Sequence, residues 1–94
     1  MTYIYEQYYL PYTLPLSSLP VGNSGEVYDV CITGDLGRRV KELGFVPGIT
    51  VKALHRSPLG DPTAYDVLGT VIALRSDDAS KIRVRIPGSY SGGK

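Results

Sequence analysis

The sequence has few of the side chains from which catalytic and metal sites are built. Its 94 residues include one cysteine, Cys31, one histidine, His55, and no tryptophan. A single cysteine excludes an internal disulfide framework and fits a reducing compartment. Structural zinc sites need paired cysteine or histidine ligands at short spacings, and a serine nucleophile needs a histidine placed with an acid. We therefore expect that the protein is not an enzyme.

The sequence also lacks an excess of charge of either sign and lacks any long apolar run. Ten basic and nine acidic residues leave a net charge of +1. This balance argues against nucleic-acid binding through phosphate neutralisation and against electrostatic attachment to anionic membranes. No apolar run approaches the roughly 20 residues that span a bilayer, and the N-terminus lacks the basic start and apolar stretch of a secretory signal. We expect a cytoplasmic protein that does not insert into membranes.

The first fifteen residues differ in composition from the rest of the chain. Five of the eight tyrosines lie here, at positions 3, 5, 8, 9 and 12, and Pro11 and Pro15 interrupt any regular element. Two interpretations remain open: a partly disordered leader, or a segment that docks on the domain, on a partner or on a second copy. We divide the chain into this leader (1–15), one domain (16–87) and a flexible glycine-rich tail (88–94).

Five short β-rich runs and one helix predict a mostly β fold. The last run, Ile82–Ile86, alternates apolar and basic residues as a half-buried strand does. A short helical turn with Asp77 and Asp78 at its start is expected just before it. At this length the natural solution is a small SH3-like antiparallel barrel, closed or nearly closed, and closure would protect its strand edges. The other predicted strands are Glu26–Ile32, Ile49–Ser57, Thr63–Leu68 and Thr70–Leu74.

The predicted helix covers residues 35–43. Leu36, Val40 and Leu43 recur at helical spacing and are expected to face the core, whereas Arg38 and Lys41 project from the opposite face. Within this helix a glycine at position 37 costs up to about 1 kcal/mol relative to alanine, unless it permits close packing.

The ends of this helix carry recognisable signals. Asp35 is the expected N-cap, and Gly44 is placed for a left-handed C-terminal cap that would bring Phe45 back onto the helix. Pro47 and Gly48 then suit the centre of a type II turn. Just before the helix, Cys31 is expected to pack as a small hydrophobe, with activation by the nearby helix start as the alternative.

Several of these segments, taken in order, resemble one protein family. The run Asp35–Gly48 (D-L-G-R-R-V-K-E-L-G-F-V-P-G) and the Pro-Leu-Gly-Asp-Pro loop at 58–62 resemble signatures of the ferrous iron transport protein A (FeoA) family. The opening segment Leu16–Val27 and the closing strands resemble the same family, so that the resemblance covers roughly residues 16–86. The tyrosine-rich leader lies outside the family pattern.

The resemblance implies an SH3-like barrel that acts as a non-enzymatic cytoplasmic accessory of bacterial ferrous iron uptake. Its partner would be the cytoplasmic part of the membrane GTPase-permease, ferrous iron transport protein B (FeoB). A similar barrel forms the C-terminal domain of iron-dependent repressors, so the alternative is a freestanding iron-sensing or transition-metal-binding regulatory module. A proline-peptide-binding SH3 module is a weaker third hypothesis, because few aromatic residues follow the leader.

The implied link to iron makes the possible metal ligands worth weighing. A weak Fe²⁺ site could use Asp29, His55, Asp61 or Asp66, but their spacing does not support one. Asp61 is better interpreted as a turn residue. We therefore assign no metal ligand and no cofactor.

A protein without chemistry of its own must act through contacts. The solvent-facing Arg38 and Lys41 and the tip of the Pro58–Pro62 loop, Leu59, are the partner-binding residues that we predict. Arginine is enriched at protein interfaces, and Leu59 would be a rigid apolar anchor between turn residues.

Overall fold

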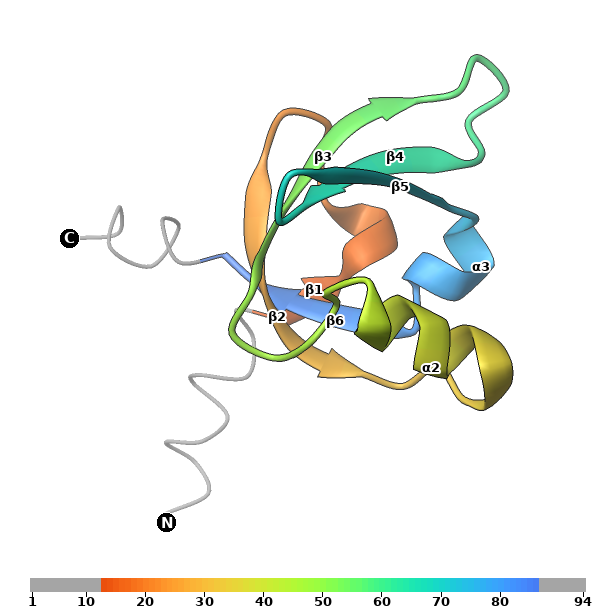
Figure 1. The fold of residues 1–94 in the computed structure, drawn as a ribbon. Helices are drawn as coiled ribbons and strands as arrows, with labels where there is room; N and C mark the ends of the chain where they lie inside the picture. Colours follow the sequence, from red (N-terminus) through yellow and green to blue (C-terminus); the bar gives the residue numbers. More distant parts are fainter. Residues whose placement is uncertain (1–12, 87–94) are drawn as a thin grey trace, which may run out of the picture.

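Six strands form one antiparallel sheet, which curves around the core as a small barrel (Figure 1). The computed structural model describes residues 13–86. The strand order in the sheet is β1-β6-β2-β3-β4-β5. The strands are β1 (Thr13–Pro15), β2 (Ser24–Val30), β3 (Thr50–Arg56), β4 (Thr63–Val67), β5 (Thr70–Leu74) and β6 (Ile82–Arg85). The helical elements are the 3-10 turn η2 (Leu16–Ser18), the helix α2 (Gly34–Glu42) and the single turn α3 (Ser76–Ala79).

The predicted mostly β fold and all five predicted strands are confirmed, with ends that differ by no more than two residues. The alternation in β6 is real, because Ile82 and Val84 are fully buried while the arginines between and after them are not. Strands β4 and β5 form a hairpin whose turn residues, Leu68 and Gly69, both have positive φ. That conformation matches the twist of the flanking strands.

Strand β1 was not predicted. It lies at the end of the segment that the composition assigned to the leader, and it pairs with β6 through Thr13 opposite Arg85 and Pro15 opposite Arg83. The Arg83 Nη2 also donates to the carbonyl and the hydroxyl of Thr13, both at 3.1 Å. A strand of three residues is too short to show an alternation of apolar and polar residues. Its partner strand is about 70 positions away in sequence, so no local pattern predicts the pairing. The rest of the predicted leader, and the predicted tail, lie outside the described residues.

The core fills the inside of the curved sheet, and η2 and α2 contribute buried residues to it. The two leucines of the opening segment, Leu16 and Leu19, are fully buried there. Tyr65 is 1% exposed, and burial raises the pKa of its phenol, whose oxygen lies 3.5 Å from the Leu16 carbonyl. The other buried members are Val27, Ile32, Val40, Phe45, Val51, Ala53, Val67, Leu74, Ala79, Ile82 and Val84.

The helix α2 is rotated relative to its predicted orientation. Val40 is 1% exposed as expected, but Leu36 and Leu43 are 38% and 45% exposed. The buried line follows Gly37 and Val40 instead. A Cβ built on Gly37 would lie 2.1 Å from the Ile32 carbonyl oxygen, so this glycine permits an approach that turns the two leucines outward. The inward face predicted for Leu36 and Leu43 is therefore wrong.

The C-terminal end of α2 follows the prediction, and its start does not. Phe45 N–H donates to the Val40 carbonyl at 3.0 Å and Gly44 N–H to the Lys41 carbonyl at 3.1 Å, the paired bonds of a Schellman cap. Gly44 has φ +121°, and Phe45 is fully buried. The N-cap position is Thr33 rather than Asp35, which lies in the first turn.

Candidate interaction surface

The outer face of α2 carries charges that neutralise one another in part. The Arg38 guanidinium lies 3.3 Å from the Asp35 carboxylate and 3.9 Å from that of Glu42, and its side chain stays 64% exposed. Such exposed pairs contribute about 0.3–0.5 kcal/mol each. They hold the arginine in place on the solvent side of the helix, beside the exposed Lys41.

The loop between β3 and β4 has an exposed apolar residue, Leu59, at its tip. Leu59 is 95% exposed, more than any other large hydrophobic residue described. Ser57 braces the loop: its hydroxyl donates to the Asp61 carbonyl at 2.7 Å, and its own carbonyl accepts the Gly60 N–H at 2.7 Å. Leu59 is exposed at the tip of this loop, as predicted.

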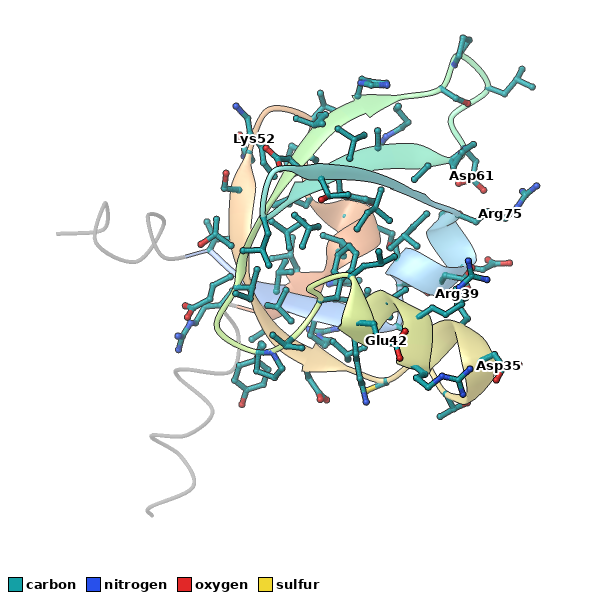
Figure 2. The ribbon with its side chains drawn as sticks, in the orientation of Figure 1. Asp35, Arg39, Glu42, Lys52, Asp61 and Arg75 are labelled. Atoms are coloured by element: carbon teal, nitrogen blue, oxygen red, sulfur yellow. The ribbon has the colours of Figure 1, made fainter. Side chains whose placement is uncertain are left out.

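Asp61 does more than turn the chain. Its Oδ1 accepts the Ser76 N–H at 2.8 Å, at the start of α3, and its Oδ2 lies 3.9 Å from the Arg75 guanidinium (Figure 2). A carboxylate is favourable at a helix N-terminus because the first N–H groups lack partners within the helix. Asp61 caps α3 from a loop 15 residues earlier in the sequence, so no local sequence motif predicts this contact.

The predicted partner-binding residues fall into two separate patches. The loop that carries Leu59 and the helix that carries Arg38 and Lys41 lie at opposite ends of the view in Figure 1, with α3 between them. Both patches are exposed, as predicted, but the fold does not join them into one continuous surface.

Cys31 is exposed, so the prediction that it packs as a small hydrophobe is wrong. Its Sγ donates to the Asp29 carboxylate at 3.2 Å. This hydrogen bond, aided by partial desolvation and by the negative charge of Asp29, raises the pKa of the thiol. The raised pKa disfavours the thiolate and so argues against the activation by the helix start that was the alternative.

We expect Asp29→Asn to accelerate alkylation of Cys31 several-fold at pH 7.5. Removal of the carboxylate lowers the thiol pKa, so more of the reactive thiolate is present at that pH. The rate of modification by a water-soluble iodoacetamide, measured across pH, would show its midpoint move to lower pH. Asp35→Asn is the control, since that acid does not contact the thiol, and an unchanged midpoint in Asp29→Asn would contradict the assignment.

The acids and the histidine weighed as metal ligands are not brought together. Asp29 is engaged with Cys31, Asp61 with α3, and the Asp66 carboxylate accepts the Gly69 N–H at 3.0 Å in the β4–β5 turn. His55 lies exposed on β3. Among residues 13–86 no three side chains of His, Cys, Asp or Glu are grouped to hold a metal ion.

A second set of exposed apolar residues was not predicted from the sequence. Leu68 is 68% exposed and Val71 63% exposed on the β4–β5 hairpin. A Cβ on Gly44 would lie 3.0 Å from the Leu68 Cδ1, which places this side chain over the end of α2. The sequence V-L-G-T at residues 67–70 could have indicated this exposure. A two-residue hairpin turn requires positive φ, and leucine is unusual at such a position.

A family model described as the FeoA domain matches residues 14–86. The chain belongs to the FeoA domain family. A curated relative from Porphyromonas gingivalis, an Fe(2+) transport protein A/Fe(2+) transporter FeoB fusion protein, is 35% identical over 74 residues. The match covers 79% of this chain but only 9% of the relative.

Solved FeoA structures share the fold. The FeoA protein from Chlorobium tepidum is 36% identical, with a TM-score of 0.74 over 78% of this chain and 70% of that one. FeoA from Stenotrophomonas maltophilia, described as an SH3 domain protein and solved with zinc, is also 36% identical, with a TM-score of 0.66 over 73% and 86%. A manganese-dependent transcriptional repressor, 17% identical with a TM-score of 0.69 over 79% and 41%, shares the fold alone.

None of the helices described between residues 13 and 86 is long and apolar enough to cross a membrane.

Proposed function

We propose that this FeoA domain is a non-enzymatic cytoplasmic accessory of bacterial ferrous iron uptake, and that it binds the cytoplasmic part of FeoB. The observation that carries the proposal is the Porphyromonas relative, in which an FeoA part and an FeoB transporter share one chain. Joining two modules raises their effective concentration and favours a contact between them. A separate FeoA domain must supply that contact through its own surface.

Two patches are proposed to make the contact. One is the outer face of α2 with Arg38 and Lys41, and the other is the Leu59 tip. Arginine is enriched among the residues that dominate binding energy at interfaces, and exposed loops often carry binding residues. A partner larger than this domain can reach both patches at once, although α3 separates them.

The experiment is to measure binding of purified FeoB cytoplasmic domain to two variants, Arg38→Glu/Lys41→Glu and Leu59→Ser. Each is expected to weaken binding by about tenfold or more, as loss of an interface anchor does, and to slow Fe²⁺ uptake in cells. Lys52→Glu on β3, far from α2 in Figure 2, is the control for a reversed lysine charge outside both patches and should bind normally. Normal binding and uptake by both folded variants would place the working surface elsewhere.

The alternative is a freestanding metal-binding regulatory module, and one comparison favours it: the Stenotrophomonas relative was solved with zinc. The scattered acids and histidine of residues 13–86 do not. We expect anaerobic calorimetric titration with Fe²⁺ or Zn²⁺ to show no stoichiometric site of micromolar affinity. A 1:1 site that disappears in His55→Ala would favour the metal-binding module over the accessory.

A further inference from the structure

The two edge strands of the sheet, β1 and β5, differ in how well they are protected from pairing with a further strand. Within the part of the chain that the structure describes, β5 pairs with β4 alone and β1 with β6 alone. Strand β1 is three residues long and ends in Pro15, and short strands and prolines discourage further pairing. Strand β5 (T-V-I-A-L) has no charge and no proline, and its register with β4 contains no bulge.

The free edge of β5 is open to solvent. Val67 lies opposite Thr70 across the two-residue turn, so this pair exchanges its backbone hydrogen bonds. The alternation of an antiparallel ladder then leaves the backbone groups of Val71 and Ala73 pointing away from β4. Both residues are exposed, Val71 by 63%. A bare, uncharged edge of this kind is a template for one more strand.

Leu68 extends this edge with an apolar side chain held in a disfavoured conformation. Its φ is +55°, a region that L-residues with bulky side chains rarely adopt, and it is 68% exposed. Asparagine or glycine would fit the turn with less strain. Strain and apolar exposure in one residue point to a contact. We call Leu68, Val71 and Ala73 the β5 edge.

The chain itself contains a segment suited to this edge. Residues 2–10 read T-Y-I-Y-E-Q-Y-Y-L, which is rich in β-formers, carries one charge at Glu6, and has no proline before Pro11. β-prone segments of low charge and without proline are those that add to open edges. In an extended strand, Tyr3, Tyr5 and Tyr9 would share one face, and aromatic residues pair favourably with a β-branched neighbour such as Val71.

We propose that residues 2–10 of one copy pair as an added antiparallel strand with the β5 edge of a second copy. The strand order makes β1 and β5 run in opposite directions, so a segment antiparallel to β5 runs parallel to β1. If this segment paired with β5 of its own copy, residue 10 would lie at one end of the sheet and Thr13, where β1 starts, at the other end. The step from residue 10 to Thr13 spans at most about 11 Å, against about 17 Å for a strand the length of β5.

A second copy avoids this limit, because its β5 edge can lie in any orientation relative to the leader that it receives. Reciprocal exchange between two copies would cover both open edges and give a two-fold dimer. The inference is independent of transporter binding, since it concerns the leader and β5 rather than α2 and the Leu59 tip.

The first measurement is the mass of the full chain by analytical ultracentrifugation over a range of concentrations. The parent is expected to be a dimer that dissociates on dilution. Val71→Lys, which places a charge on the edge, and Tyr5→Pro, which breaks the added strand, are each expected to be monomers. Val21→Lys, the same change at an exposed valine outside β5, should remain a dimer. A monomeric parent overturns the proposal.

The second measurement shows whether the strand passes between copies. In ¹⁵N-labelled Tyr5→Pro protein, amide hydrogen exchange at Val71 and Ala73 is expected to slow by about tenfold or more when unlabelled Val71→Lys protein is added. The added protein supplies an intact leader but offers no edge of its own. The unlabelled double variant should have no effect. Unchanged exchange with the single variant, or equal slowing with both, overturns the proposal.

Discussion

Replacement of Val40 by aspartate is expected to abolish cooperative folding at 25 °C. Val40 is 1% exposed and lies where α2 meets the core. The change removes a packed side chain and buries a carboxyl group without a partner, which together cost about 4 kcal/mol or more. At about 0.05–0.15 kcal/mol per residue, a domain of about 70 residues has only about 4–11 kcal/mol of total stability, so a loss of this size removes most or all of it. Urea unfolding followed by circular dichroism would show the loss of a cooperative transition.

Leu36→Asp is the matched control for Val40→Asp. Leu36 is one turn earlier on α2 and 38% exposed, and an acid in the first turn of a helix is favourable. Its free energy of unfolding is expected to stay within about 1 kcal/mol of the parent. Comparable losses in both variants would mean that α2 packs on the face predicted from periodicity and not on the one observed.

Gly37→Ala is expected to lower the free energy of unfolding by about 1–3 kcal/mol, the usual cost of overpacking. Helix propensity alone predicts the opposite sign, since alanine is better than glycine by about 1 kcal/mol inside a helix. The tertiary contact decides, because the added Cβ would lie 2.1 Å from the Ile32 carbonyl oxygen and 2.7 Å from its carbon. Both atoms belong to the backbone, so the helix itself must move.

The measurement is again urea unfolding, with Arg39→Ala as the control at an exposed position of the same helix. Arg39→Ala is expected to change the stability by no more than about 0.5 kcal/mol. A Gly37→Ala protein more stable than its parent would show that the backbone around Ile32 shifts at little energetic cost to accommodate the added methyl group. The close approach of α2 would then not be what turns Leu36 and Leu43 outward.

Local patterns were sufficient for most of the secondary structure. The alternation of β6, the bounds of β5 and the Schellman cap at Gly44 each depend on residues within a few positions of one another. The exposure of Arg38 and of Leu59 was predictable for the same reason, since helix period and turn composition are local properties.

Tertiary structure alone decided the features that depend on residues distant in sequence. Strand β1 exists because β6 offers it a partner, and the cap of α3 comes from Asp61 in another loop. The inward face of α2 was set by the room that Gly37 leaves at the Ile32 carbonyl, which no periodicity encodes. The separation of the two patches predicted to bind a partner, and the open β5 edge, follow from strand order, because neighbours in the sheet are chosen by packing of the whole chain.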